Sequence, residues 1–190
     1  MNLIFAVKGT VRYKEASTLL IELQNIIIRV WCDSESIERS SIGQQIELFT
    51  HLELNQNEAV LYGFSRREKL HIFEKILKVS KIGPKTALKI VGSVEPEEFV
   101  HLVVNKDVER LGQLPGIGKK TAERLIAELK DEQFEVDSKY STQLFDAIEA
   151  LVALGFGRTE SSEVARSVFD DSMNTEQIVK EALKKLTKRK

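Results

Sequence analysis

The chain has 190 residues, of which 42% are hydrophobic and 30% charged, and its formal net charge is −1. This composition allows packed cores but excludes a membrane protein, because no apolar stretch approaches the roughly 20 residues that span a bilayer. The N-terminal residues do not have the pattern of a secretory signal, and the single cysteine, Cys32, cannot form an internal disulfide. We therefore expect a protein of the reducing cytoplasm.

Charge is distributed unevenly along the chain. Residues 65–90 carry eight basic and two acidic side chains, whereas residues 131–179 carry three basic and eleven acidic ones. Phosphate binding responds to the local potential within a Debye length of about 8–10 Å. A net charge near zero therefore does not exclude nucleic acid as a ligand.

Residues 1–64 predict β-structure. Apolar and β-branched residues gather in five runs, and the run over 46–54 alternates between apolar and polar residues over most of its length, as in a half-buried strand. We expect turns at Glu15–Ser17, Asp33–Ser41 and 55–57. The predicted strands are Leu3–Val11, Thr18–Leu23, Ile26–Cys32, Gln45–Leu54 and Ala59–Phe64. Five strands in so short a segment favour a small closed barrel, since closure removes the sheet edges.

The periodicity becomes helical at residue 65. Apolar residues from Leu70 to Leu77 recur on one helical face, Pro96 suits the first turn of a helix, and Thr121–Lys130 is amphipathic. We predict an all-helical domain over 65–130 and a polar, acidic linker over 131–139.

Residues 140–190 predict a small domain of three helices. The first helix ends at Gly155, which suits the left-handed conformation beyond a helix C-terminus. Asn174 and Gln177 have the spacing of a capping box that opens the third helix.

An internal repeat carries the functional information. The segment VSKIGPKTA at 79–87 recurs as LPGIGKKTA at 114–122, offset by 35 positions, and each copy lies between two helical patterns. Glycines allow a tight turn and a close approach, and each turn leads into a helix N-terminus, where unpaired N–H groups favour an anion. Nothing in the repeat reaches a base edge, so the predicted contact is to the sugar–phosphate backbone. The repeat resembles the helix-hairpin-helix motif, and two copies suggest binding to duplex DNA.

Other phosphate-binding motifs fail on spacing. A P-loop needs glycine where the chain has Gln113, and the Rossmann fingerprint needs glycine where it has Thr121. The remaining alternative is a pair of glycine-ended helical turns with solvated lysines.

Longer stretches resemble the RuvA family, the Holliday-junction-binding subunits of the RuvAB branch-migration complex. The resemblance runs over nearly the whole length, and its most specific part is LPGIGKKTAERL at 114–125. The other matching stretches are Phe49–His51, Leu61–Phe64, Ile82–Lys85 and Ala150–Phe156.

The resemblance implies an OB-fold barrel, a tandem helix-hairpin-helix domain and a C-terminal three-helix, UBA-like domain. It also implies a homotetramer, or an octamer, that binds four-way junction DNA and recruits the hexameric ATPase RuvB. From the residues themselves we expect no cofactor, metal ion or catalytic site, because the histidines are scattered and no nucleotide-phosphate loop is present. Carried over by position, the DNA-binding backbone amides are those of Lys81, Gly83, Gly116 and Gly118, and the DNA-binding side chains are those of Lys85, Lys119, Lys120 and Arg124. Arg124 has an alternative role as the ion-pair partner of Glu128, one helical turn later.

The chain departs from the family pattern in two places. The first hairpin has Lys81 where the family usually has glycine. The loop between the last two strands, Asn55–Glu58, lacks the usual pair of adjacent acids, which are replaced by Gln56 and Asn57. In the family this loop forms a pin at the junction centre, so we expect reduced selectivity for junctions over duplex.

Two residues beside Gly155 are candidates for the contact with RuvB. Leu154 is expected to pack in the three-helix core, whereas Phe156 is compatible with either role.

Two other functions remain open. One is a scaffold that binds ordinary duplex with reduced junction selectivity. The other is a helix-hairpin-helix repair enzyme, which is disfavoured because Asp131 and Asp137 lack the glycine- and proline-rich surroundings of a glycosylase aspartate.

Overall fold

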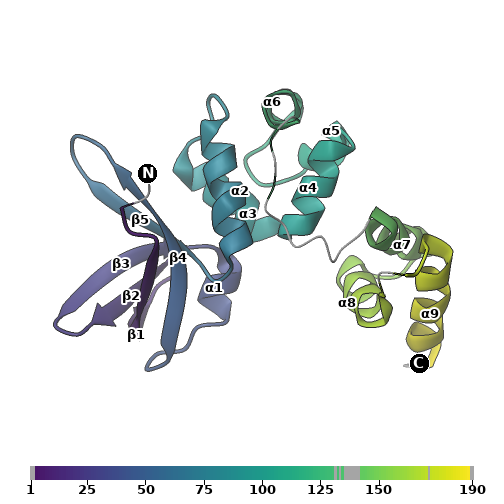
Figure 1. The fold of residues 1–190 in the computed structure, drawn as a ribbon, viewed down its shortest axis with the longest axis horizontal. Coiled ribbons are helices and arrows are strands. Elements are labelled where there is room, and N and C mark those ends of the chain that lie inside the picture. The colour runs from purple at the N-terminus through teal and green to yellow at the C-terminus, as the bar shows by residue number, and fades with distance from the viewer. Residues whose placement is uncertain (1–2, 131, 133, 135–141, 171, 189–190) are drawn as a thin grey trace. The chain divides into compact units, whose positions relative to one another are not determined.

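The computed structural model describes residues 3–130, 132, 134, 142–170 and 172–188 (Figure 1). The chain divides into two compact units, Met1–Val136 and Asp137–Lys190. The predicted linker at 131–139 lies outside the described residues except for Glu132 and Phe134. The limits of the barrel, the helical domain and the linker therefore remain predictions.

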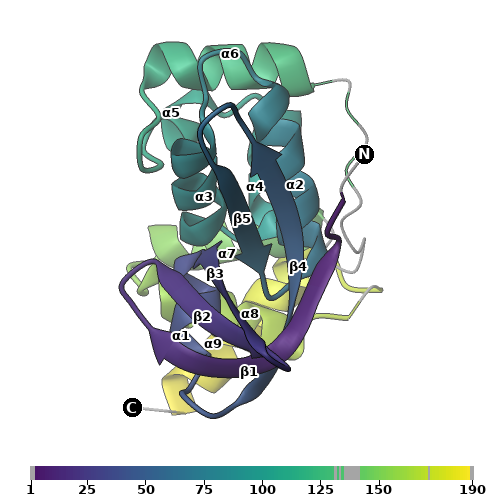
Figure 2. The ribbon, with the colours of Figure 1, turned by 90° about the vertical axis from the view of Figure 1, so that its left-hand side faces the viewer.

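The first unit begins with a closed five-stranded barrel (Figures 1 and 2). Its strands follow the order β1-β2-β3-β5-β4, and all neighbours are antiparallel except β3 and β5, which run parallel. Alternate residues such as Val11, Leu19 and Ile21 are fully buried and fill the interior. The strands are β1 (Ala6–Lys14), β2 (Thr18–Leu23), β3 (Ile26–Cys32), β4 (Gln45–Leu54) and β5 (Ala59–Phe64). Four of these ranges match the sequence prediction.

The prediction was wrong for β1, which begins and ends three residues later than expected. Leu3, Ile4 and Phe5 are exposed, and apolarity alone suggested a strand there. At the other end, a register shift after Val11 lets Tyr13 and Lys14 pair with Leu20 and Leu19 of β2. This irregularity extends the strand past its apolar segment.

A short helix, α1 (Ser34–Glu38), replaces part of the turn predicted at Asp33–Ser41. The segment is mostly polar, but Ile37 is 8% exposed and packs with the barrel core. One anchoring apolar residue was too weak a pattern to predict the helix.

Helices α2 to α6 complete the first unit. Phe73 of α2 contacts Phe64 and Tyr62 of β5, with ring centroids 5.0 and 5.2 Å apart, so the barrel and the helices share a core. The helices are α2 (Arg67–Lys78), α3 (Pro84–Ser93), α4 (Pro96–Val104), α5 (Val108–Leu111) and α6 (Lys119–Leu129).

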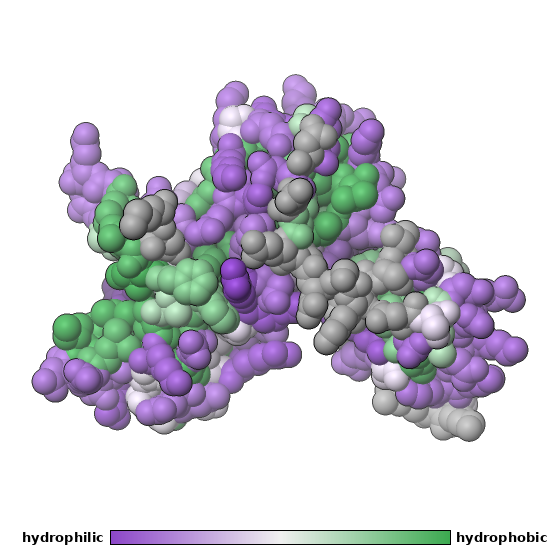
Figure 3. All heavy atoms as spheres, viewed as in Figure 1, coloured by the Kyte–Doolittle hydropathy of each residue, from purple (hydrophilic) through white to green (hydrophobic). Residues whose placement is uncertain are grey.

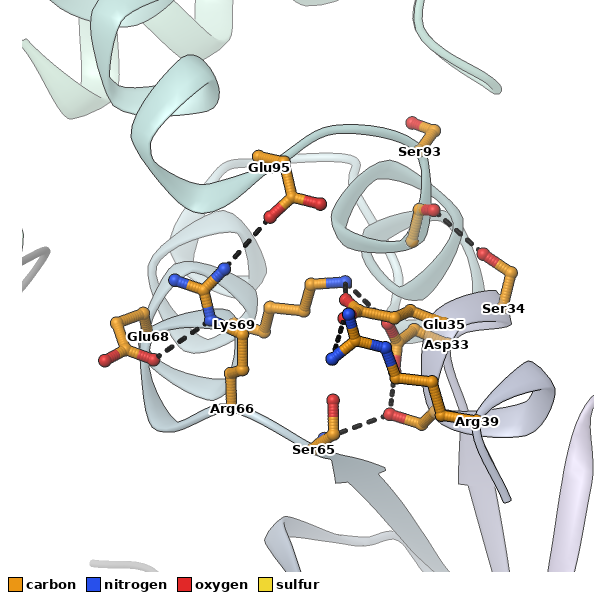
Figure 4. Close-up of polar contacts among 12 residues, drawn as sticks. Asp33, Ser34, Glu35, Arg39, Ser65, Arg66, Glu68, Lys69, Ser93 and Glu95 are labelled. Atoms are coloured by element: carbon orange, nitrogen blue, oxygen red, sulfur yellow. Dashed lines mark hydrogen bonds and ion pairs between the residues drawn. The ribbon is translucent and has the colours of Figure 1, made fainter. Parts of the chain in front are cut away.

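A buried ionic cluster also joins the barrel to the helices (Figure 4). The ammonium of Lys69 lies 2.8 Å from Asp33 Oδ2 and also contacts Glu35 of α1. Burial alone would lower the pKa of Lys69, but the charge of Asp33 and the hydrogen bonds to both carboxylates raise it. Nearby, Arg66 donates a 2.6 Å hydrogen bond to Glu97 of α4. The cluster fixes the start of α2 against both α1 and α4.

The second unit contains α7 (Thr142–Ala153), α8 (Arg158–Val168) and α9 (Thr175–Lys188). Gly155 has φ +92°, as predicted for a residue beyond a helix C-terminus. Asn174 and Gln177 exchange side-chain to backbone hydrogen bonds of 2.9 Å, which confirms the capping box.

Candidate nucleic-acid interface

The first hairpin turn joins α2 to α3. Gly83 precedes the helix, and Pro84 occupies its first position, where a missing N–H costs nothing. Lys81 has φ +66°, in the left-handed region, which costs a non-glycine residue about 1–2 kcal/mol. Lys81 thus holds a left-handed conformation that glycine adopts without a side-chain penalty.

The second hairpin turn joins α5 to α6. Gly116 has φ +79°, and Gly118 directly precedes α6. A Cβ added to Gly116 would lie 3.0 Å from Thr86 Cγ2 of α3, so this turn packs against the first hairpin. The second turn is therefore a neighbour of the helix that follows the first turn.

Backbone donors are available at both turns. The N–H groups of Lys81, Gly83, Gly116 and Gly118 make no hydrogen bond to any described residue. A Cβ added to Gly83 or Gly118 would meet no atom within 4 Å, so open space lies in front of both. The donors stand at the N-termini of α3 and α6, where the helix dipole also favours an anion.

The predicted lysines surround these donors. Lys81, Lys85, Lys119 and Lys120 are all exposed, and none forms an ion pair within the described part of the chain. The ammonium of Lys85 lies 5.6 Å from the ring centroid of Trp31 on the barrel, a contact that the sequence did not predict. In contrast, Arg66 and Lys69 are neutralised by carboxylates. Both hairpin turns thus carry uncompensated positive charge.

Arg124 has a contact that differs from both roles expected for it. Its Nη1 donates a 3.1 Å hydrogen bond to the carbonyl of Ser80, in the first turn. Glu128 accepts hydrogen bonds from Ser80 N and Oγ, at 3.1 and 2.7 Å. The two side chains therefore meet on Ser80, a residue that no local pattern in the sequence singled out.

The loop between β4 and β5 is a compact, exposed turn. Asn55 Oδ1 accepts hydrogen bonds from the backbone N–H groups of Asn57 and Glu58, at 3.0 and 2.9 Å. Gln56 is also exposed, so the tip of the loop presents amides and a single carboxylate. A groove of about 320 Å³ lies between this loop and the first hairpin, and its lining includes Glu58 and Lys85. The candidate pin and the candidate phosphate site are therefore neighbours.

The two candidate partner-binding residues of the second unit differ in exposure. Leu154 is 61% exposed, so the expectation that it packs in the core was wrong. It follows the last residue of α7 and precedes Gly155, and this position carries its side chain out of the helix packing. Phe156 is partly buried and packs against the three-helix core.

Within the described residues, no group of three or more His, Cys, Asp and Glu side chains could hold a metal ion. Among the same residues, no helix combines the length and the apolarity needed to cross a bilayer.

Comparisons with known proteins agree with this architecture. The chain matches the models of the RuvA N-terminal domain over residues 4–63, the SAM-like helix-hairpin-helix tandem over 73–131 and the RuvA C-terminal domain over 143–187. It is 38% identical to a Holliday junction branch migration complex subunit RuvA from Thermotoga petrophila, over 98% of this chain and 100% of that protein. A RuvA subunit from Alkaliphilus oremlandii is also 38% identical, over 95% of this chain and 97% of its own length. These matches confirm the predicted succession of a barrel, a helix-hairpin-helix tandem and a helical C-terminal domain, and the chain belongs to the RuvA family.

Proposed function

We propose that this protein binds four-way DNA junctions as the RuvA subunit of a branch-migration complex, and that its paired hairpin turns hold the arms by their phosphates. One observation carries the proposal. The second turn packs against α3 of the first hairpin, and both exposed turns present unbonded backbone N–H groups and unpaired lysines.

The proposed contact is independent of base sequence. Backbone amides and lysine ammonium groups at helix N-termini match phosphate oxygens, and they carry no pattern that distinguishes base pairs. The residues that we assign to it are Lys81, Gly83, Lys85, Gly116, Gly118, Lys119 and Lys120, with Arg124 close to the first turn.

The barrel supports association of subunits, and we propose a homotetramer around the junction. Apolar side chains gather on the surface of the barrel (Figure 3). The adjacent residues Ile26 and Ile27 of β3, for example, are 64% and 49% exposed, and contiguous exposed apolar patches mark interaction surfaces. Association of tetramers into an octamer is a further possibility that a mass measurement distinguishes.

We propose that the second unit recruits a hexameric ATPase of the RuvB type. Leu154 offers an exposed apolar contact beside a left-handed glycine, on a unit whose residues 142–188 form their own core. The segment 131–139 would then act as the linker. The chain itself contributes no catalytic step, and we expect it to work in the cytoplasm.

A second candidate function is a scaffold that binds ordinary duplex. It is favoured by the tip of the β4–β5 loop, where Gln56 and Asn57 replace the paired acids of the family pattern. Like charges at the junction centre would repel phosphates and keep the strands apart, and this chain retains only Glu58 at the exposed loop.

A mobility-shift titration with a labelled four-way junction and a linear duplex of the same sequence tests the proposal. Mass photometry of the same samples gives the subunit number. We expect a tetramer that prefers the junction. Equal affinity for both DNAs would favour the duplex scaffold, and no binding to either would contradict both functions.

A further inference from the structure

Hydrogen bonds with α6, the second helix of the second hairpin, hold the first hairpin turn in place. The polar groups of Ser80 have partners on α6, since Arg124 donates to its carbonyl while Glu128 accepts from its N–H and its hydroxyl. Arg124 and Glu128 are one helical turn apart and therefore lie on the same face of α6. These contacts join residues 44 and 48 positions apart in the sequence.

Holding Ser80 also orients a proposed DNA contact. The carbonyl of Ser80 and the N–H of Lys81 belong to one peptide unit, which is planar, and they point in opposite directions because the peptide is trans. The hydrogen bond from Arg124 therefore sets the direction of the Lys81 N–H. Lys81 has φ +66°, a conformation that a lysine keeps only when its surroundings enforce it.

The second turn has no such support and does not need it. The offset of 35 places Pro115–Gly116 where the first turn has Ser80–Lys81. Proline fixes φ and has no N–H to satisfy, and glycine adopts φ +79° without a side-chain penalty. The residues equivalent to Arg124 and Glu128 are Lys89 and Ser93. Within the described residues, neither forms a hydrogen bond to the second turn.

We propose that Arg124 and Glu128 are positioning residues for DNA binding, which hold Ser80 so that the Lys81 amide faces a phosphate. The inference rests on the proposed function and deepens it, because it makes the first hairpin depend on the helix of the second. The hydrogen bonds from Ser80, and then the charge of Arg124, lower the pKa of Glu128, so this carboxylate stays ionised at neutral pH.

Replacement of Glu128 by alanine separates positioning from simple electrostatics, because the two explanations predict changes in DNA affinity of opposite sign. Removing an exposed negative charge beside Lys81 should strengthen DNA binding if charge alone matters. Loss of positioning should instead weaken junction and duplex binding by about tenfold, the cost of impairing a hydrogen bond to a charged group. The salt slope should stay unchanged, because no phosphate-binding cation is lost.

Glu123→Ala is the matched control, since Glu123 is an exposed acid on the same helix and makes no hydrogen bond or ion pair with a described residue. We expect its binding to equal or exceed that of the unsubstituted protein. Glu128→Gln keeps an acceptor for Ser80 and should recover most of the affinity. Thermal unfolding and mass photometry of each variant verify that the fold and the assembly are intact.

A rescue experiment tests the physical reason. Ser80→Pro combined with Lys81→Gly copies the proline and glycine of the second turn, and Val79 has the extended conformation that a following proline requires. Because Lys81→Gly also removes a cation, this double variant is the reference: adding Glu128→Ala to it should change junction affinity by less than about twofold. Unchanged or tighter binding by Glu128→Ala in the natural turn, or an equal loss of affinity in the Ser80→Pro, Lys81→Gly background, would overturn the inference. If the unsubstituted protein binds neither DNA, the proposed function fails instead.

Discussion

The buried lysine at the joint between the barrel and the helices provides a sharp test of the packing. Lys69→Met keeps the length and the apolar stem of the side chain but removes its charge. The side chain of Lys69 is 2% exposed and that of Asp33 is 0% exposed, so the aspartate would lose its cation without gaining water. Glu35 would lose one partner but retain Arg39, 3.0 Å away.

Removing one partner of a buried pair typically costs about 3–5 kcal/mol. Because Glu35 keeps Arg39, we expect the lower part of this range, about 3–4 kcal/mol. For a unit of this size that corresponds to a fall in Tm of about 10–15 °C. The protein should still fold, since typical domains are stable by about 5–15 kcal/mol.

Thermal unfolding followed by tryptophan fluorescence measures this effect in the first unit alone, since Trp31 is the only tryptophan in the chain. Lys89→Met is the control, because Lys89 is exposed and has no ion pair with a described residue. Its Tm should change by no more than about 2 °C.

The fall in Tm of Lys69→Met relative to the unsubstituted protein should depend on pH, because Lys69 lowers the pKa of Glu35. Burial alone would raise the pKa of Glu35, but the hydrogen bond and the charge of Lys69 lower it below its usual value, so Glu35 adds stability that is lost as the pH falls below about 4.5. In Lys69→Met that contribution is weakened, because Glu35 loses the cation that lowers its pKa. The deficit of the variant should therefore be largest at neutral pH and shrink between pH 7 and about pH 3.5. A fall in Tm below about 3 °C at pH 7, or an equal deficit at both pH values, would contradict this description of the cluster.

Three further predictions concern the pin, the titration of His51 and the second unit. Gln56→Asp combined with Asn57→Asp restores paired acids and should raise the junction-to-duplex affinity ratio severalfold in competition titrations; an unchanged ratio would argue against a charge role for this loop. The hydrogen bond to Glu74, opposed by burial, raises the pKa of His51 above 6.5, so about 0.5–1 kcal/mol of stability should be present below pH 6.5 and lost as the pH rises through the raised pKa. Urea unfolding at pH 6 and pH 8.5 measures this loss, and His51→Gln should abolish it; the same loss in the variant would assign it to another group. Leu154→Ser should leave DNA binding and Tm unchanged but weaken binding to a RuvB-type ATPase about tenfold by calorimetry, and unaltered affinity would exclude Leu154 from that contact.

The sequence predicted those parts of the fold in which local pattern and packing agree. The alternation over 46–54 reflects one buried face, and β4 has the predicted range. The glycine and proline signals around the repeat predicted both hairpin turns, but they did not predict that Lys81 adopts the left-handed conformation. The β4–β5 loop likewise lies at the tip of a hairpin, as its polar residues indicated.

The features that the sequence did not reveal depend on contacts between distant residues. The helix α1 is stabilised by Ile37 against the barrel, so its polar sequence resembles a turn until the barrel is formed. Ser80 and Glu128 are 48 residues apart, and neither has a pattern that suggests the other. The exposure of Leu154 depends on where α7 ends relative to the packing of the second unit, which hydrophobicity alone does not determine.

If the two hairpin turns bind the sugar–phosphate backbone, their lysines must contribute to the salt dependence of DNA binding. Junction affinity should be measured across a range of salt concentrations for the unsubstituted protein and for Lys119→Ala combined with Lys120→Ala. We expect uniformly weaker binding across DNA sequences. The magnitude of the slope of log affinity against log salt should fall by about two for each second hairpin that contacts DNA, because each loses two phosphate-binding lysines. Affinity and slope that both match those of the unsubstituted protein would contradict a phosphate-binding role for these turns.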